Sequence, residues 1–474
     1  MKTRTVVLVN PNRMRPPVAP LGLEYLATAV EAAGFVPLLV DLAFAEDPVE
    51  ALADAFRSAD PLAVGLTLRN LDDCYMASGA WFLPDASGWV KTIKGLTGAP
   101  VVLGGTGFSI APRPALEATG ADYGVRGDGE WPFIELLSAL AAGADVSGVP
   151  GLVFRRDGRV EVNPAKPWDL AELPAQARDH LDNARYFAEG GQGAIETKRG
   201  CDGGCIYCVD CHTKGRVLRL RDPRRAADEV EALLAQGVDV LHTADAEFNR
   251  PYDHAAAVCR ELARRGLPVR WYAYASPSPF DAQLAQAMAE AGCLGVDFGA
   301  DSGDDDLLAG LGRDHTGADL AAAAAACKEA GMAVMFDLLV GGPGETRESL
   351  QRTVDLVCAV PVDVIGVNIG ARVYPGTALA ESILAEGRLA DNPCLHGEVE
   401  GNEEMLRPVF YVSPALGDDP LGAVRVATAG DARFLLPVEQ GAQKGYNYND
   451  NSPLEAAIAA GARGAYWDII RRMS

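Results

Sequence analysis

The sequence has little positive charge, no long apolar run and no regular spacing of its cysteines. Lys and Arg number 42 against 65 Asp and Glu, for a net charge of −23. This balance argues against a nucleic-acid-binding surface, which needs clustered Lys and Arg. No apolar stretch is long enough for a membrane span, and residues 6–9 are too few for a signal peptide. Ten irregularly spaced cysteines indicate reduced thiols. We therefore expect a soluble cytoplasmic protein without nucleic-acid or membrane partners.

Three of the ten cysteines, Cys201, Cys205 and Cys208, lie in one glycine-rich stretch. Their spacing lets a folded loop point all three sulfurs at one inorganic centre. Iron–sulfur cubanes normally take four thiolates, so three imply either a distant fourth cysteine or an iron left open for a small molecule. A structural zinc site is the alternative. It would need further ligands, for which Cys211 and His212 are nearest.

Residues 1–148 alternate short apolar runs with helical patterns. Strands are expected at residues 5–10, 36–41, 62–67, 100–105 and 123–125, and helices at 21–33 and 48–58. Near-continuous apolar strands in this alternation predict a Rossmann-like, doubly wound parallel sheet. Its ligand should lie beyond the carboxyl ends of the strands. Glycine-rich turns at 104–109 and 127–130 stand at two such ends, where a ligand can approach the backbone.

Residues 193–390 repeat a strand-then-helix unit six times. The strands are expected at 194–198, 238–245, 269–275, 294–300, 333–340 and 362–372. This repetition predicts a parallel barrel with its site at the carboxyl ends of the strands. The cysteine loop follows the first of these strands. Tyr272 and Tyr274 alternate along the third strand and so face the same side, where they either contact a substrate or fill the barrel.

Two segments carry no assigned chemistry. Residues 149–192 are expected to form a hairpin, turning at 157–158, and a linker strap. Residues 391–474 are expected to form a small α+β region, with an extended segment at 408–414, a strand at 423–428 and a helix at 454–460. A polar loop at 445–451 could close over a substrate or be a surface turn.

The cysteine motif, with Arg199-Gly200 before it and Tyr207 ahead of the third cysteine, resembles the radical S-adenosylmethionine (SAM) superfamily. The resemblance implies a [4Fe-4S] cluster on Cys201, Cys205 and Cys208, with SAM on the open iron, in a partial (β/α)6 barrel. Turns after the later strands match the family's SAM pocket, most closely 341–346. The residues that the resemblance places near SAM are Tyr207, Asp245, Asp301, Ser302, Gly342 and Arg372.

The first domain resembles the cobalamin-binding domain that precedes many radical SAM domains. Pro17, residues 20–25 and the two glycine-rich turns carry this resemblance. It implies cobalamin contacts at Gly104, Gly105, Thr106, Ser109, Gly127, Gly129 and Glu130. The domain contains no histidine to ligate cobalt from below. Arg69, at the tip of the third strand, is the candidate for that face. Alternatively, Arg69 is a surface or ion-paired arginine near Asp72 and Asp73.

Together these resemblances imply a cobalamin-dependent radical SAM methyltransferase, which uses methylcobalamin to methylate a carbon or phosphorus of a small, natural-product-type substrate. Cys201, Cys205, Cys208, Arg69, Tyr272 and Tyr274 form the expected catalytic set. An electron donor such as flavodoxin or ferredoxin is the expected partner. Radical and polar methyl transfer both remain open. The alternatives are a non-methylating cobalamin enzyme, a plain radical SAM enzyme with a degenerate first domain, and an iron–sulfur or zinc regulator.

Overall fold

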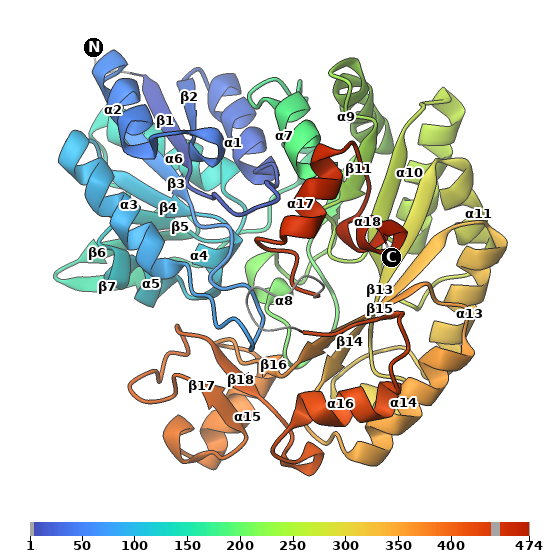
Figure 1. Ribbon diagram of the computed structural model, residues 1–474. Coiled ribbons are helices and arrows are strands. Elements are labelled where there is room, and N and C mark those ends of the chain that lie inside the picture. The colour runs from blue at the N-terminus through green and yellow to red at the C-terminus, as the bar shows by residue number, and fades with distance from the viewer. Residues whose placement is uncertain (1–3, 438–445, 474) are drawn as a thin grey trace.

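The computed structural model describes residues 4–437 and 446–473. Two parallel-sheet domains lie side by side, the first coloured blue to cyan and the second green to orange in Figure 1. The C-terminal segments, orange to red, pack against the second domain. The expected α/β fold class is thus confirmed. Within the described ranges, no helix has the length and apolar character needed to cross a membrane.

The first sheet has strand order β2-β1-β3-β4-β5-β6-β7, and its first five strands are parallel. These strands are β1 (Thr5–Asn10), β2 (Val36–Asp41), β3 (Ala63–Thr67), β4 (Val101–Gly104) and β5 (Tyr123–Val125). The helices around them are α1 (Leu21–Ala32), η1 (Leu42–Phe44), α2 (Pro48–Ser58), α3 (Leu83–Leu96), α4 (Thr106–Ile110), α5 (Pro112–Thr119) and α6 (Glu130–Ala142). Val7 packs into one core and Leu8 into another. Both faces of the sheet are therefore buried, which explains its almost uninterrupted apolar strands.

The expected hairpin, β6 (Leu152–Arg156) and β7 (Arg159–Val162), extends this first sheet instead of forming part of a linker. β6 pairs antiparallel with β5. Asp157 and Gly158 both have positive φ values, of 50° and 78°, as a tight two-residue hairpin turn requires. The remaining connection contains η2 (Leu170–Glu172) and α7 (Asn183–Gly190).

The second sheet is a partial barrel with one strand more than expected. Its order is β19-β15-β14-β13-β12-β11-β8, and all neighbouring pairs are parallel. The strands are β8 (Gly193–Ile195), β11 (Val240–Thr243), β12 (Arg270–Ala275), β13 (Cys293–Asp301), β14 (Ala333–Val340), β15 (Val364–Ile369) and β19 (Phe434–Leu435). The outer helices are α9 (Pro223–Ala235), α10 (Tyr252–Arg265), α11 (Ala282–Glu290), α12 (Asp305–Gly310), α13 (Gly317–Glu329) and α14 (Arg347–Ala359). The seventh strand, β19, comes from the C-terminal region and pairs with β15.

The C-terminal region contributes a three-stranded antiparallel sheet and several helices. The strands are β16 (Ala371–Arg372), β17 (Leu395–Gly397) and β18 (Val409–Tyr411). The helices are α15 (Ala378–Glu386), η3 (Leu389–Asp391), η4 (Pro414–Leu416), α16 (Pro420–Thr428), α17 (Ser452–Ala459) and α18 (Tyr466–Met473). The strand expected at 423–428 is wrong. Asp419 caps this segment and Pro420 occupies its first turn, so it is a helix. In the polar loop at 445–451, Gly445 lies outside the described residues.

The loop after β3 ties the first domain to the barrel. Asp72 of this loop forms a buried ion pair with Arg372, Nε to Oδ2 2.8 Å, and accepts a hydrogen bond from Tyr374 at 3.0 Å. Tyr75 donates to the backbone oxygen of Tyr446 at 3.1 Å. On the other side, α4 packs against the short helix α8 (Asp210–Thr213) that follows the cysteine loop. The ligand-binding ends of the two sheets therefore face each other.

Candidate active site between the two domains

The cysteine motif forms a loop closed at its base by β9 (Lys198–Arg199) pairing with β10 (Arg219–Leu220). The first barrel strand therefore ends at Ile195, earlier than expected. The loop folds around Gly203, where a Cβ atom would lie 3.4 Å from Cys201 Sγ and 3.8 Å from Cys205 Sγ. Among the described residues, no three His, Cys, Asp or Glu side chains surround a single metal position. An iron–sulfur cluster contains several irons, so its thiolate ligands need not surround a single metal position.

Burial raises the pKa of all three cluster-motif thiols, most strongly that of Cys208. Without a metal these thiols are neutral, and their protons must leave when iron binds. The loop thus supplies three partly buried thiols, two of which flank Gly203. This donor set fits the expected [4Fe-4S] cluster.

Arg313 is a site residue that the sequence analysis missed. Its side chain is 7% exposed. The guanidinium donates to Cys205 Sγ at 3.0 Å and to the backbone oxygen of Gly299 at 2.6 Å. It also pairs with Asp301 Oδ2 at 3.1 Å. Arg313 partly offsets the effect of burial on the pKa of Cys205. The sequence offers no motif for it, because Arg313 stands 108 positions from Cys205.

The SAM-pocket residues fall into two groups. Asp301 lies at the barrel rim beside the cysteine loop, where it accepts a hydrogen bond from Tyr207 Oη at 2.5 Å. Gly342 also lies at the rim, because a Cβ there would stand 3.1 Å from Leu311, whose carbonyl accepts from the cysteine loop. Ser302, in contrast, is buried and shares a 2.8 Å hydrogen bond with the Thr353 hydroxyl. Its assignment to SAM stays a prediction.

Asp245 and Arg372 also have hydrogen-bond partners within the protein. Asp245 is buried and accepts from the backbone N–H of Thr197 at 2.8 Å and from its hydroxyl at 2.6 Å, which fixes the base of the cysteine loop. Arg372 donates to Asp72, Val373 and Met405 in a buried cluster. Through these contacts Arg372 ties the two domains together, and its expected role at SAM stays a prediction.

Glu130 likewise belongs to the domain interface. Its carboxylate receives two hydrogen bonds from the Arg199 guanidinium, at 2.9 and 2.7 Å. This buried pair lowers the pKa of Glu130 against the opposing effect of burial. Since Arg199 stands two residues before Cys201, the pair links the cysteine loop to the first domain. The expected contact of Glu130 with cobalamin stays a prediction beside this structural role.

The two glycine-rich turns of the first domain form a cradle closed by Ser109. The Ser109 hydroxyl accepts from Gly127 N at 3.0 Å and donates to Gly105 O at 2.9 Å. Gly105 has φ +97°, and a Cβ there would lie 2.6 Å from Leu68 O. At Gly104 and Gly129, by contrast, an added Cβ would meet nothing within 4 Å. The exposed side chain of Thr106 lies at the same edge. This open backbone surface fits a large cofactor.

Two family models match the chain: the radical SAM superfamily over residues 195–357 and the B12 binding domain over residues 12–137. A tryptophan 2-C-methyltransferase of Streptomyces laurentii is 32% identical over 98% of this chain and 96% of its own. The solved structure of the radical SAM methyltransferase TsrM from Kitasatospora setae, with tryptophan and a SAM analogue bound, superposes with a TM-score of 0.92. That protein is 32% identical, over 99% of this chain and 98% of the other. A second TsrM structure, with cobalamin and a [4Fe-4S] cluster, gives a TM-score of 0.89 at 31% identity, with the same coverage.

The chain belongs to the cobalamin-dependent radical SAM methyltransferases. This membership confirms the resemblance stated from the motifs, the enzyme class and the three cofactors: the [4Fe-4S] cluster, SAM and cobalamin. The main alternatives, a non-methylating enzyme and a degenerate first domain, are not favoured.

In this methyltransferase Arg69 points out of the first domain toward the barrel. Its side chain is exposed, yet burial among protein groups lowers its pKa, and its nearest electrostatic partners are Tyr466 and Tyr274. The alternative of an ion pair does not hold for the described residues. Asp72 is taken by Arg372, and Asp73 accepts from Asn447 at 3.0 Å. Arg69 therefore faces the space between the cofactor cradle and the barrel mouth.

The two tyrosines of β12 do face the barrel interior, at different depths. Tyr274 is 46% exposed although surrounding protein raises the pKa of its hydroxyl, so its ring borders a solvent-accessible interior space. Tyr272 is buried one layer lower. It donates to Asp468 Oδ2 at 2.7 Å and packs edge-on against Trp467. Tyr272 therefore belongs to the barrel floor, and its expected catalytic role stays a prediction.

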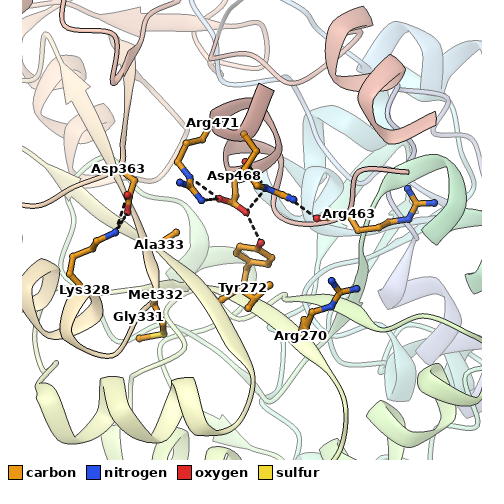
Figure 2. A pocket seen from close by; sticks show the side chains of 12 residues that line it. Arg270, Tyr272, Lys328, Gly331, Met332, Ala333, Asp363, Arg463, Asp468 and Arg471 are labelled. Carbon is orange, nitrogen blue, oxygen red and sulfur yellow. Dashed lines mark hydrogen bonds and ion pairs between the residues drawn. The ribbon is translucent and has the colours of Figure 1, made fainter. Parts of the chain in front are cut away.

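A pocket of about 380 Å³ lies beneath this floor. Figure 2 shows that its walls come from the amino-terminal ends of the barrel strands and from α18, with the Tyr272 hydroxyl turned toward Asp468. Lys328 pairs with Asp363 at 2.8 Å on one side. Since chemistry in parallel barrels occurs at the carboxyl ends, this pocket is separate from the active site.

Proposed function

We propose that this enzyme methylates an aromatic carbon of tryptophan or of a close indole derivative. The observation that carries the proposal is the match over nearly the whole chain to a tryptophan 2-C-methyltransferase and to a tryptophan-bound structure. The barrel interior is consistent with a flat aromatic substrate. The ring of Tyr274 lies 4.6 Å from that of His242, and the tyrosine ring is partly exposed. Aromatic side chains of this kind stack well on an indole.

We assign the cluster to Cys201, Cys205 and Cys208, and the cobalamin cradle to the backbone of residues 104–106 and 127–129. The bound cofactors supply the methyl-transfer chemistry, and the protein positions them and excludes water. Ser109 holds the two cradle turns together. Arg69 places a cation between cradle and barrel, where it can bind an anionic group but cannot ligate cobalt as histidine would.

At the rim of the barrel, Tyr207 and Asp301 are the residues that we assign to SAM. Asp301 combines its contacts to Tyr207 and Arg313 with a positive φ of 56°, which fixes its side chain beside the cluster loop. One of its carboxylate oxygens, Oδ1, takes no part in these contacts and can accept from a ribose hydroxyl. Because Gly342 has no side chain, it adds no bulk to the rim at this point, where a Cβ atom would lie 3.1 Å from Leu311.

We further propose a cytoplasmic location and a small electron-transfer protein, such as flavodoxin or ferredoxin, as partner. All ten cysteines are free thiols, with none in a disulfide, which is the pattern of a reducing compartment. An iron–sulfur cluster that cycles its charge needs an external electron source. Activity supported by a reduced flavodoxin, and absent without any reductant, would support this partner.

The direct test is anaerobic purification with hydroxocobalamin, followed by iron, sulfide and cobalt analysis and incubation with methyl-labelled SAM and L-tryptophan. We expect about four irons per chain, one cobalt, and 2-methyltryptophan by mass spectrometry. Cys205→Ser should lose the cluster and the product, whereas Cys211→Ser should retain both, because Cys211 only makes a weak 3.9 Å contact to the Cys208 carbonyl. Iron without cobalt would refute the methyltransferase assignment, and a fully loaded enzyme inert toward indoles would refute the substrate.

A further inference from the structure

A polar layer crosses the barrel interior just above its apolar floor. Asp297 of β13 lies beside Tyr274 in the strand register, and Asp337 of β14 lies beside Gly299. Side chains two residues apart on one strand share a face, so Asp297 and Asp337 are diagonal neighbours on the inner face. The floor below them contains Tyr272 and Trp467. Two carboxyl groups therefore meet inside the barrel, on the active-site side of its floor.

One oxygen of this pair is left without a partner. Asp297 is 3% exposed and its carboxyl shares a hydrogen bond with Asp337, but its Oδ1 accepts from no donor among the described residues. Asp337 accepts a hydrogen bond from the hydroxyl of Tyr446. A buried unpaired carboxyl oxygen is unfavourable. Such an atom is expected where a ligand supplies the missing donor.

The pair carries one negative charge near neutral pH. Burial and the neighbouring carboxylate raise the pKa of Asp297 well above its ordinary value, while burial raises that of Asp337 to about 6. One carboxyl is thus protonated and the other ionised, as expected for two like charges in contact. The other titratable groups that interact with the pair are Tyr75, Tyr274, Asp301, Tyr446 and Tyr448. Arg69 and His242 lie next to Tyr274.

We propose that the Asp297–Asp337 pair is the substrate-recognition subsite for a nitrogen-bound hydrogen, donated by the ammonium group or the ring N–H of the substrate. The inference rests on the proposed function, since both donors belong to an indole amino acid. A donor is required because the Asp297 carboxyl shares its proton with Asp337 in a hydrogen bond, so that its remaining oxygen can only accept. The single negative charge of the pair additionally favours a cationic donor over a neutral one. Tyr446 holds the Asp337 carboxylate in place, so that Asp297 Oδ1 is the oxygen offered to the substrate.

The test compares two substitutions at Asp297 in the cofactor-loaded enzyme. Asp297→Leu removes the acceptor with little change in volume, and we expect it to weaken L-tryptophan binding at least tenfold in equilibrium dialysis, with KM raised more than kcat is lowered. Asp297→Asn keeps an acceptor oxygen and, with Asp337 ionised, the charge of the pair, so its affinity should stay within about threefold of wild type. Asp363→Leu makes the same change at the other end of the barrel and should leave affinity unchanged.

Two analogues identify the donor. Indole-3-propionate lacks the ammonium group, and 1-methyltryptophan lacks the ring N–H. Wild type should discriminate against one of them, and Asp297→Leu should abolish that discrimination. If Asp297→Leu binds tryptophan as wild type does, or keeps the discrimination, the subsite is refuted while the proposed function stands. Wild-type binding of tryptophan without methylation would refute the function, and the variants would still decide the subsite by binding. If the wild-type enzyme binds none of these indoles, both the subsite and the proposed function are refuted.

Discussion

Removal of the Asp72 carboxylate should destabilise the protein through the domain interface. Asp72 and Arg372 have side-chain exposures of 1% and 4%, so Asp72→Ala leaves a buried guanidinium without its counter-ion. Breaking a buried pair typically destabilises by about 3–5 kcal/mol. Three backbone carbonyls still accept from Arg372, which places the loss near the lower end, about 3 kcal/mol. This corresponds to a roughly 150-fold smaller folding equilibrium constant. Urea unfolding followed by tryptophan fluorescence measures it.

Two comparison variants make this prediction specific. Asp239→Ala breaks the Arg270–Asp239 pair, whose side chains are 42% to 49% exposed, and should change stability by less than about 1 kcal/mol. Asp72→Ala combined with Arg372→Met removes the stranded charge and should recover part of the lost stability. If Asp72→Ala lowers the free energy of unfolding no more than Asp239→Ala does, the buried pair does not hold the domains together.

Three further predictions concern other parts of the chain. Gly105→Ala should lower the free energy of unfolding by about 1–3 kcal/mol through backbone strain and reduce the bound cobalt. Gly88→Ala, in α3 with open space around it, should raise the free energy of unfolding by about 0.5–1 kcal/mol. Equal effects of the two substitutions would contradict the cradle geometry. Burial raises the pKa of Glu345 to about 7 from 4.5, so the folded state holds an extra proton between these values and stability should fall as pH rises through that window. The free energy of unfolding should fall by about 3 kcal/mol, and Glu345→Gln should not show this fall. Urea unfolding at pH 5 and at pH 7.5 measures the difference. Cys208→Ser should abolish the iron–sulfur absorption that Cys211→Ser keeps; loss in both would make Cys211 a ligand.

The regular elements could be predicted because each carries its pattern locally. The fifth barrel strand, 333–340, has the bounds of β14. Its apolar run is interrupted only by Asp337, and glycines lie close to both of its ends. β19 has only two residues and depends on pairing with β15, which no local pattern contains. The strand expected at 423–428 failed because alternating valines outweighed the capping residue Asp419. Val426 in fact points into solvent, 81% exposed.

The site could be located from the sequence more reliably than its contacts could. Motif spacing placed the cysteine loop and the glycine turns correctly, because each is a short local structure. It could not distinguish charged residues that bind a cofactor from those that hold the loops. Glu130 and Arg372 both form ion pairs at the domain interface, and their expected cofactor contacts stay predictions. Arg313 and Asp337 were missed because they reach the site only through the closure of the barrel.

The residues that hold the cofactor loops are also the residues that join the domains. Arg199 precedes the first cluster cysteine and pairs with Glu130, which directly follows the second glycine turn of the cradle. Asp128 of the same turn pairs with Arg219 of β10, the strand that closes the cysteine loop. The positions of the cysteine loop and the cradle are therefore set by one another. A shift of the first domain must move the cysteine loop, so the geometry between cluster and cobalamin is fixed by buried charge pairs and not by a flexible linker.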